Sequence, residues 1–230
     1  MPLSIASRSV GDITVLTCTG RIVEGDEATT LESYVRKLLP RQPYIVIDAG
    51  GVAFVDSCGL GLLLRLRTLA RAAAGDLKLC AANHHVGEVL RVTKLAAVLP
   101  PYPSELEAIT AFYTAVEADD PWAPLEGDLL CVHSSLDVLV YARELLKQAG
   151  YGVVTASNVS DARVLLRATR PRVLVIDADS RARLAALTGE DASTHLAVVG
   201  WPADFSTEDP GDAAHQLLSE VSRALTHGRL

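Results

Sequence analysis

Hydrophobic and polar residues alternate at the start of the chain. Two such runs, residues 3–10 and 13–19, are separated by Gly11-Asp12, a dipeptide that favours the tight turn of a β-hairpin. Apolar residues then recur at helical spacing up to Pro40, which predicts an amphipathic helix. Residues 44–48 are apolar and β-branched, as expected of a strand covered on both faces. We therefore place them at the centre of a sheet.

A second strand-to-helix junction follows. An apolar run at 52–55 stops at Asp56-Ser57-Cys58-Gly59, and a leucine-rich stretch continues to Ala73. This pattern places Asp56 and Ser57 at the N-terminus of a helix. Further strands are expected at 77–81 and 98–102, with helices at 86–93 and 104–118. The predicted order of the first half is ββαβαβαβα.

The pattern changes after an acidic segment that contains two prolines, residues 117–126. Such composition is typical of a linker, so we divide the chain into a domain at 1–118, a linker at 119–127 and a domain at 128–230. In the second domain short apolar runs alternate with helical patterns. Strict alternation predicts an α/β domain with a parallel sheet. We expect strands at 129–132, 152–155, 173–176 and 196–200, and helices at 135–149, 160–169, 181–187 and 212–225.

Composition restricts the classes of function. The chain has 230 residues, 49% of them hydrophobic and 21% charged, which is close to the globular average. Its net charge is −7 with no basic stripe, so direct binding to nucleic acid is disfavoured. We find no leader-like start and no apolar stretch of about 18 residues. These features predict a cytoplasmic protein without a membrane segment.

No motif for catalysis or metal binding stands out. The cysteines are widely spaced and lack a CxxC pair, and His84-His85 has no ligand partner at a suitable spacing. We find no HExxH, P-loop or GxGxxG pattern and no Ser-His-Asp arrangement. The sequence therefore predicts neither an enzyme nor a bound cofactor or metal. The four cysteines are Cys18, Cys58, Cys80 and Cys131.

The junction at Asp56 and Ser57 is the most informative stretch. Helix N-termini carry free N–H groups and the positive end of the helix dipole, so a phosphate on Ser57 would sit where these donors point. Gly59 and Gly61 leave the first turn without side chains, which would keep the hydroxyl open to a partner. Taken alone, however, Asp and Ser at this place are more typical of a helix cap than of a switch.

A family resemblance changes that balance. Residues 3–115 resemble a STAS domain, the fold of anti-sigma factor antagonists, which has a mixed β-sheet with helices on one face. The order of elements agrees, and DSCGLG at 56–61 stands where the family has its D-S-[ST]-G-L-G loop. Supporting similarities are Gly20-Arg21-Ile22, the segment 90–95, Tyr102 and the segment 104–109.

The resemblance implies a partner switch in bacterial signal transduction and transcription regulation. By analogy Ser57 is phosphorylated by an anti-sigma factor that is a serine-protein kinase of the GHKL type, and the unphosphorylated form captures that kinase. Asp56, Ser57, Cys58 and Gly59 would form the partner-binding surface. Two positions depart from the family, since Cys58 replaces Ser or Thr and Val23 stands where many members carry an acid. A different kinase is one consequence to expect.

The second domain resembles the receiver domain of response regulators, a flavodoxin-like parallel α/β fold. Asp177 ends a strand at the usual phosphoacceptor position, but His133 and two serines stand where paired acids would hold Mg²⁺. Gly200 replaces the usual Thr or Ser, and no lysine follows Lys147. We therefore interpret residues 128–230 as a degenerate pseudo-receiver that mediates homodimer formation or partner choice. The alternative is a phosphorelay response regulator in which Asp177 accepts phosphate and controls the STAS domain.

Overall fold

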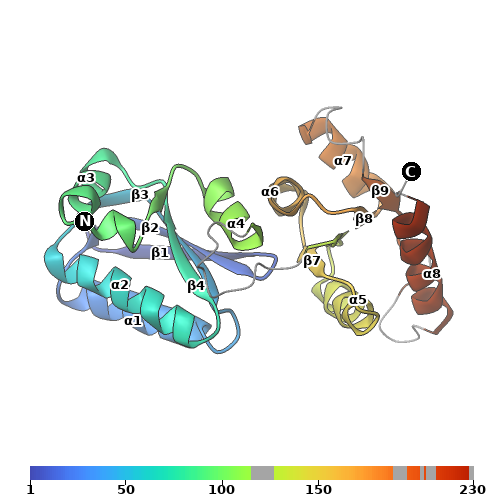
Figure 1. Cartoon of the computed structure of the whole chain (residues 1–230), viewed down its shortest axis with the longest axis horizontal. Coiled ribbons are helices and arrows are strands. Elements are labelled where there is room, and N and C mark those ends of the chain that lie inside the picture. Colours follow the sequence, from blue (N-terminus) through green and yellow to red (C-terminus); the bar gives the residue numbers. More distant parts are fainter. Residues whose placement is uncertain (115–126, 189–195, 203–204, 206–210, 228–230) are drawn as a thin grey trace. The chain divides into compact units, whose positions relative to one another are not determined.

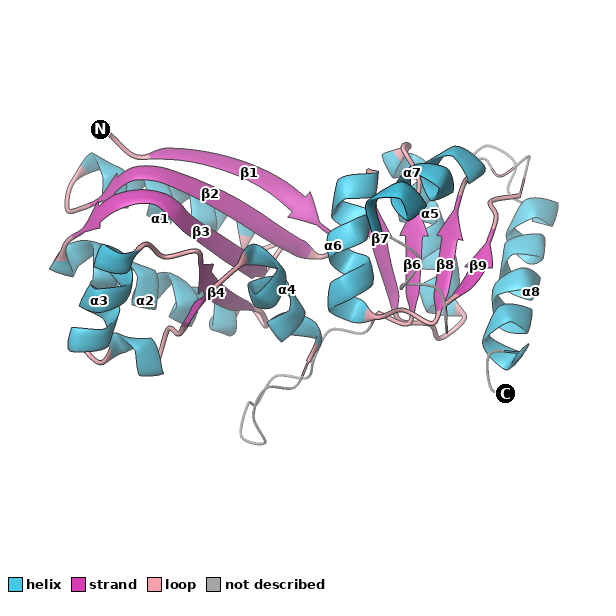
Figure 2. Cartoon of the chain, turned by 90° about the horizontal axis from the view of Figure 1, so that it is seen from above, coloured by secondary structure: helices cyan, strands magenta, loops and turns pink. Residues whose placement is uncertain are grey.

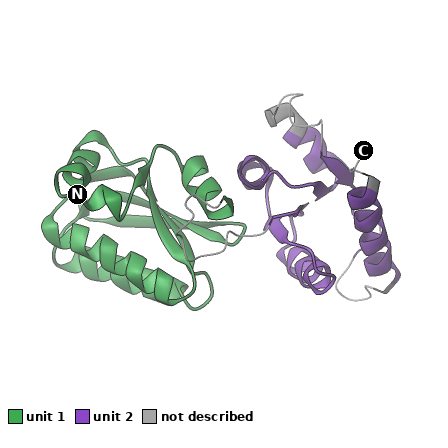
Figure 3. Cartoon of the chain, viewed as in Figure 1, with its two compact units in different colours: residues 1–123 green, residues 124–230 purple. Residues whose placement is uncertain are grey.

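The computed structural model describes residues 1–114, 127–188, 196–202, 205 and 211–227. The chain forms two compact units, Met1–Ala123 and Pro124–Leu230 (Figure 3). Of the linker predicted at 119–127, all but Gly127 lies outside the described residues. Each unit has its own hydrophobic core and is considered by itself.

The first unit is built on a mixed five-stranded sheet with the order β1-β2-β3-β4-β5. β1 and β2 are antiparallel and join through Gly11, whose φ of 60° suits the turn. The pairs β2-β3, β3-β4 and β4-β5 are parallel. Both the hairpin and the central place of β3 are confirmed. The strands are β1 (Ser4–Val10), β2 (Ile13–Ile22), β3 (Tyr44–Val55), β4 (Asp76–Cys80) and β5 (Pro101–Tyr102).

Helices cover both faces of this sheet (Figure 1). The helices are α1 (Asp26–Leu38), α2 (Ser57–Ala72), α3 (His84–Val92) and α4 (Glu105–Tyr113), with a short 3₁₀ helix at Leu95–Ala97. Leu31, Leu63 and Leu90 of the first three pack with Ile45 and Ile47 on one face. On the opposite face Phe112 of α4 makes an edge-to-face contact with Tyr44 at 5.5 Å between ring centroids. The expectation of helices on one face is therefore wrong for α4.

β3 is longer than its apolar run predicted, and this extension positions the candidate site. The pairing with β2 is irregular between Thr17 and Thr19 and again between Gly20 and Arg21. Gly51 permits the close approach, because a Cβ there would lie 2.5 Å from Cγ2 of Thr19. β3 therefore continues beside β2 to Val55, and Phe54 lies opposite Arg21.

The second unit has a four-stranded sheet with the order β7-β6-β8-β9 in which every pair is parallel (Figure 2). The predicted parallel α/β arrangement is thus confirmed, and the order is consistent with a flavodoxin-like sheet. The strands are β6 (Leu129–Val132), β7 (Val153–Ala156), β8 (Val173–Ile176) and β9 (Ala197–Val199). The helices are α5 (Leu136–Gln148), α6 (Val159–Thr169), α7 (Ala178–Thr188) and α8 (Gly211–His227).

Among the helices that the structure describes, none combines the length and the apolar character that crossing a bilayer requires.

Candidate functional site

The Asp56 carboxylate joins the end of β2 to the beginning of α2. One oxygen, Oδ1, accepts a hydrogen bond from the backbone N–H of Gly59 at 2.7 Å, and Oδ2 accepts one from the N–H of Glu24 at 3.0 Å. The backbone N–H of Asp56 donates to the carbonyl of Ile22 at 3.3 Å. Asp56 is therefore the N-cap residue of α2. These contacts hold the loop after β2 against the first turn of the helix.

These hydrogen bonds also fix the charge of the cap. Donation from the N–H groups of Gly59 and Glu24 lowers the pKa of Asp56, and the N–H of Cys58 and the positive charge of Arg21 add to the effect. The ionised carboxylate thus uses donors of the helix start itself. In the unmodified protein the N–H of Gly59, one of the donors expected to meet a phosphate on Ser57, donates to Asp56.

Ser57 and Cys58 follow the cap and are both exposed. Because Asp56 caps the helix, the Ser57 hydroxyl has no capping role. Negative charge on Glu24 is the main cause that raises the pKa of the Cys58 thiol, with Asp56 contributing, while a hydrogen bond to Ser57 lowers it. The first turn of α2 therefore presents a hydroxyl and a protonated thiol to solvent, flanked by two carboxylates.

Gly59 belongs to the interior rather than to this surface. It is buried, and a Cβ at this position would lie only 2.1 Å from the carbonyl oxygen of Ile22. The need for glycine comes from the close approach of α2 to β2. Its expected role in keeping the hydroxyl open is wrong, although that explanation suits Gly61, around which a Cβ would meet nothing within 4 Å.

An exposed aromatic residue lies at the same end of the sheet. The Phe54 side chain is 39% exposed, and its ring contacts two polar side chains. The guanidinium carbon of Arg21 is 5.7 Å from the ring centroid, and the imidazole of His85 stacks on it at 5.5 Å with an interplanar angle of 20°. Sequence reasoning missed this arrangement. The sequence pattern suggested only a metal-ligand role to weigh for His85. The pairing of Arg21 with Phe54 was not predictable because it depends on the irregular register between β2 and β3.

Comparison with known proteins bears on this unit. Residues 4–108 match the family model of the STAS domain. The matched segment contains the junction at Asp56 and Ser57. The predicted resemblance of the N-terminal half to a STAS domain is therefore confirmed.

The relatives agree with the STAS match. BtrV of Bordetella bronchiseptica, named as an anti-sigma factor antagonist, is 27% identical over 103 residues, which are 44% of this chain and 89% of that protein. The anti-sigma F factor antagonist of Paenibacillus polymyxa is 31% identical over 67 residues, 29% of this chain and 57% of that protein. A solved anti-sigma factor antagonist from Mycobacterium paratuberculosis is similar at 24% identity and a TM-score of 0.43, covering 47% of this chain and 92% of that one.

The second unit lies outside the residues matched to the STAS domain, and its receiver-like character stays a prediction. Asp177 lies at the end of β8, where Oδ1 accepts a hydrogen bond from the N–H of Ser180 at 2.8 Å. Burial raises the pKa of Asp177, but hydrogen bonds from Ser180 and the charge of His133 outweigh it, so the pKa lies below its ordinary value. Asp177 thus remains ionised while it caps the first turn of α7.

Aromatic residues cover the neighbouring strand end in this unit. The indole Nε1 of Trp201 donates to the carbonyl of Val132 at 2.8 Å. The ring packs edge-on against His133, with centroids 5.3 Å apart, and against Phe205 at 5.2 Å. Trp201 itself is half-buried.

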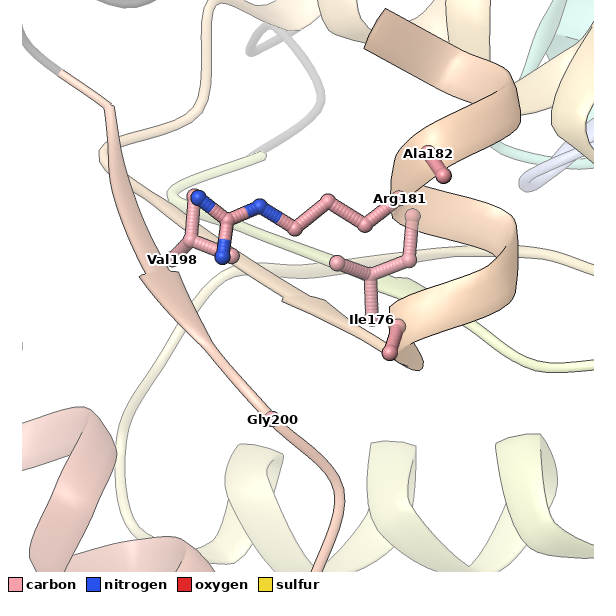
Figure 4. A pocket seen from close by; sticks show the side chains of 6 residues that line it. Ile176, Arg181, Ala182, Val198 and Gly200 are labelled. Atoms are coloured by element: carbon pink, nitrogen blue, oxygen red, sulfur yellow. The ribbon is translucent and has the colours of Figure 1, made fainter.

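A shallow cavity of about 450 Å³ opens beside β9 (Figure 4). The side chain of Arg181 crosses it toward Val198, so its apolar walls carry a single cationic group. Its lining residues are Ile176, Ala178, Arg181, Ala182, Val198 and Gly200. In the part of the chain that the structure describes, no three His, Cys, Asp or Glu side chains gather in a way that could hold a metal ion.

Proposed function

We propose that this chain is an anti-sigma factor antagonist that works as a partner switch, with Ser57 as its phosphoacceptor. The observation that carries the proposal is the exposed Ser57 hydroxyl at the start of α2, within the segment that matches the STAS domain. Asp56 serves as the cap, which leaves Ser57 available for chemistry. The names of the two relatives support an anti-sigma factor as the partner.

The electrostatics of the junction support the direction of the switch. A phosphate brings a charge of about −1.5 to −2 at neutral pH. It would be placed on Ser57 next to the ionised Asp56 and close to Glu24. A partner that docks on the neutral hydroxyl would then meet a strongly negative surface. Phosphorylation by a GHKL-type serine-protein kinase would therefore release that kinase, and the unmodified form would capture it.

The second unit has the role of an interaction module in this proposal. Its predicted site pairs Asp177 with His133 rather than with further acids, and Trp201 packs over His133. Such a site is suited to a fixed pseudo-receiver that mediates homodimer formation or partner choice. The chain as a whole would act by binding and not by catalysis.

The experiment is partner capture from the cells that naturally make the protein. Ser57→Ala should retain a GHKL-type kinase, identified by mass spectrometry, and Ser57→Glu should lose it. Ser134→Ala serves as the matched control, because Ser134 is an exposed serine of the second unit. Equal capture by all three variants would contradict the proposal, and so would the absence of any GHKL-type kinase from all of them.

The phosphorelay alternative rests on Asp177, which is ionised and lies at the C-terminal end of a parallel strand. It predicts that acetyl phosphate with Mg²⁺ adds one phosphoryl group that is labile to hydroxylamine. Intact mass of the parent and of Asp177→Asn tests this directly. An adduct that is lost in the variant would support the alternative, and no adduct in either would leave the pseudo-receiver interpretation.

A further inference from the structure

A phosphate on Ser57 needs a source of positive charge, and the helix start supplies little. The N–H groups of Gly59 and Glu24 already donate to the Asp56 carboxylate. Two carboxylates, those of Asp56 and Glu24, flank the exposed Ser57 and Cys58 side chains. Since like charges repel, a phosphoserine here would be stabilised by a side chain that brings positive charge.

Arg21 is suited to this role. It is the residue before Ile22, whose carbonyl accepts the hydrogen bond from the Asp56 N–H. Its positive charge is already felt at the carboxylate, since it contributes to the lowered pKa of Asp56. The guanidinium is exposed and lies over the Phe54 ring, and among the described residues no carboxylate forms an ion pair with it.

We propose that Arg21 binds the phosphate on Ser57 and, by moving to it, uncovers the face of Phe54. This proposal rests on Ser57 being the phosphoacceptor. In the unmodified protein Arg21 lies over the Phe54 ring. In the phosphorylated protein the guanidinium donates to phosphate oxygens instead, and Phe54 keeps only its stacking contact with His85. The modification thus changes both the charge and the apolar surface that a partner meets.

The relative strength of the two contacts favours this exchange. A cation–π contact at an exposed site is weak, whereas an Arg–phosphate pair is charge-assisted and bidentate. His85 cannot replace Arg21 without giving up its own stacking on the ring. The exchange involves the side chain of an exposed residue and breaks no ion pair among those that the described residues form.

The test uses the full chain with phosphoserine installed at position 57 during translation, so that no kinase is required. The probe is the phosphoserine itself, whose second pKa is followed by ³¹P NMR in the parent, in Arg21→Gln and in Arg21→Lys. Arg41→Gln is the control. It removes the same charge from an exposed residue that precedes β3, at the opposite end of that strand.

We expect the pKa of the phosphoserine in the parent to lie about half a unit to one unit below that in Arg21→Gln. Arg21→Lys should fall between the two, and Arg41→Gln should match the parent. The ring-proton shifts of Phe54, assigned with Phe54→Leu, should change on phosphorylation in the parent and not in Arg21→Gln. Equal pKa values in the parent and Arg21→Gln, or unchanged Phe54 shifts in the parent, would overturn the role of Arg21. Because the phosphate is installed directly, neither result depends on whether cells phosphorylate Ser57.

Discussion

Gly59 and Gly61 are two residues apart in the same helix but have different surroundings. A Cβ on Gly59 would overlap the carbonyl of Ile22 at 2.1 Å, and a Cβ on Gly61 would meet nothing within 4 Å. We predict that Gly59→Ala destabilises the protein by about 1–3 kcal/mol, as overpacking does. Gly61→Ala should stabilise it by about 0.5–1 kcal/mol, because alanine loses less backbone entropy in a helix. Urea unfolding measures both values, and a Gly59→Ala variant as stable as the parent would contradict the close approach.

Cys58 differs from the other cysteines in its exposure. Burial raises the pKa of Cys18, Cys80 and Cys131 to about 12 in each case, and only Cys58 is exposed. We predict that the folded protein reacts with one equivalent of a thiol reagent. The rate should rise with pH because the thiolate is the reactive form, and the rise should lie at higher pH than for an ordinary thiol because Glu24 raises the pKa of Cys58. Mass spectrometry of the labelled protein checks the site. Cys58→Ser should remove the reaction, and labelling of a second cysteine under native conditions would contradict the assignment.

At the residue scale the sequence was a partial guide to the site. The helix start at Asp56 and Ser57 could be predicted, because an N-cap and a strand end are local signals. The contacts of Phe54 with Arg21 and His85 could not be predicted. They depend on the irregular register between β2 and β3, which pairs Arg21 with Phe54, 33 positions later in the sequence. The close approach that requires glycine at position 59 could not be predicted either, because it involves Ile22, which is distant in sequence.

At the scale of elements, a cluster of charges joins α2 to β4. Nε and Nη2 of Arg67 donate to the two oxygens of Asp76 at 2.9 and 3.2 Å, and Arg71 donates to Oδ1 at 3.2 Å. Lys78 lies 3.8 Å from Asp76 and packs over Phe112 of α4 at 4.8 Å. The Asp76 side chain is 7% exposed. Asp76 therefore lies within ion-pair distance of three cations, Arg67, Arg71 and Lys78.

Removal of Asp76 should weaken this junction strongly. We predict that Asp76→Ala destabilises the protein by about 3–5 kcal/mol, because buried cations lose their counter-charge. Glu32→Ala, which breaks the exposed pairs with Arg36 and Arg65, should cost much less, because exposed ion pairs contribute little to stability. Thermal or urea unfolding compares the two. Equal losses would show that Asp76 does not hold these elements together.

The same cluster gives a dependence on pH. Burial raises the pKa of Asp76, but the hydrogen bonds and charges of Arg67 and Arg71 outweigh it and lower the pKa below its ordinary value. The folded form therefore binds this proton less readily than the unfolded chain does. The stabilisation is present above the unfolded pKa and is lost as the pH falls through the folded pKa. In Asp76→Asn this part of the acid sensitivity should vanish, which unfolding curves between neutral and acidic pH would measure.

Most elements could be predicted because their signals are local. Alternating runs gave the β1-β2 hairpin, and the alternation of strands with helices gave the parallel sheet of the second unit. The placement of α4 on the second face of the first sheet could not be predicted. It depends on the contacts of Phe112 with Tyr44 and Lys78, which bring together residues from three separate elements.

At the scale of the whole molecule, the two units bury separate cores. The STAS match accounts for residues 4–108 and leaves the second unit to be interpreted from its own geometry. There the sequence placed Asp177 and His133 at strand ends, but it did not indicate the cover by Trp201. The hydrogen bond that holds Trp201 there, from its indole N–H to the carbonyl of Val132, joins residues 69 positions apart. We propose that the first unit carries the switch and that the second serves partner choice.

The central claim is that Ser57 carries the switch. The most direct test is phosphosite mapping of the intact protein purified from the cells that naturally produce it, with Ser57→Ala mapped in parallel. We predict phosphate on Ser57 in a fraction of the parent molecules. In Ser57→Ala the peptide that contains position 57 should carry no phosphate. A parent in which Ser57 is unmodified under every growth condition, while a GHKL-type kinase is bound to it, would contradict the account.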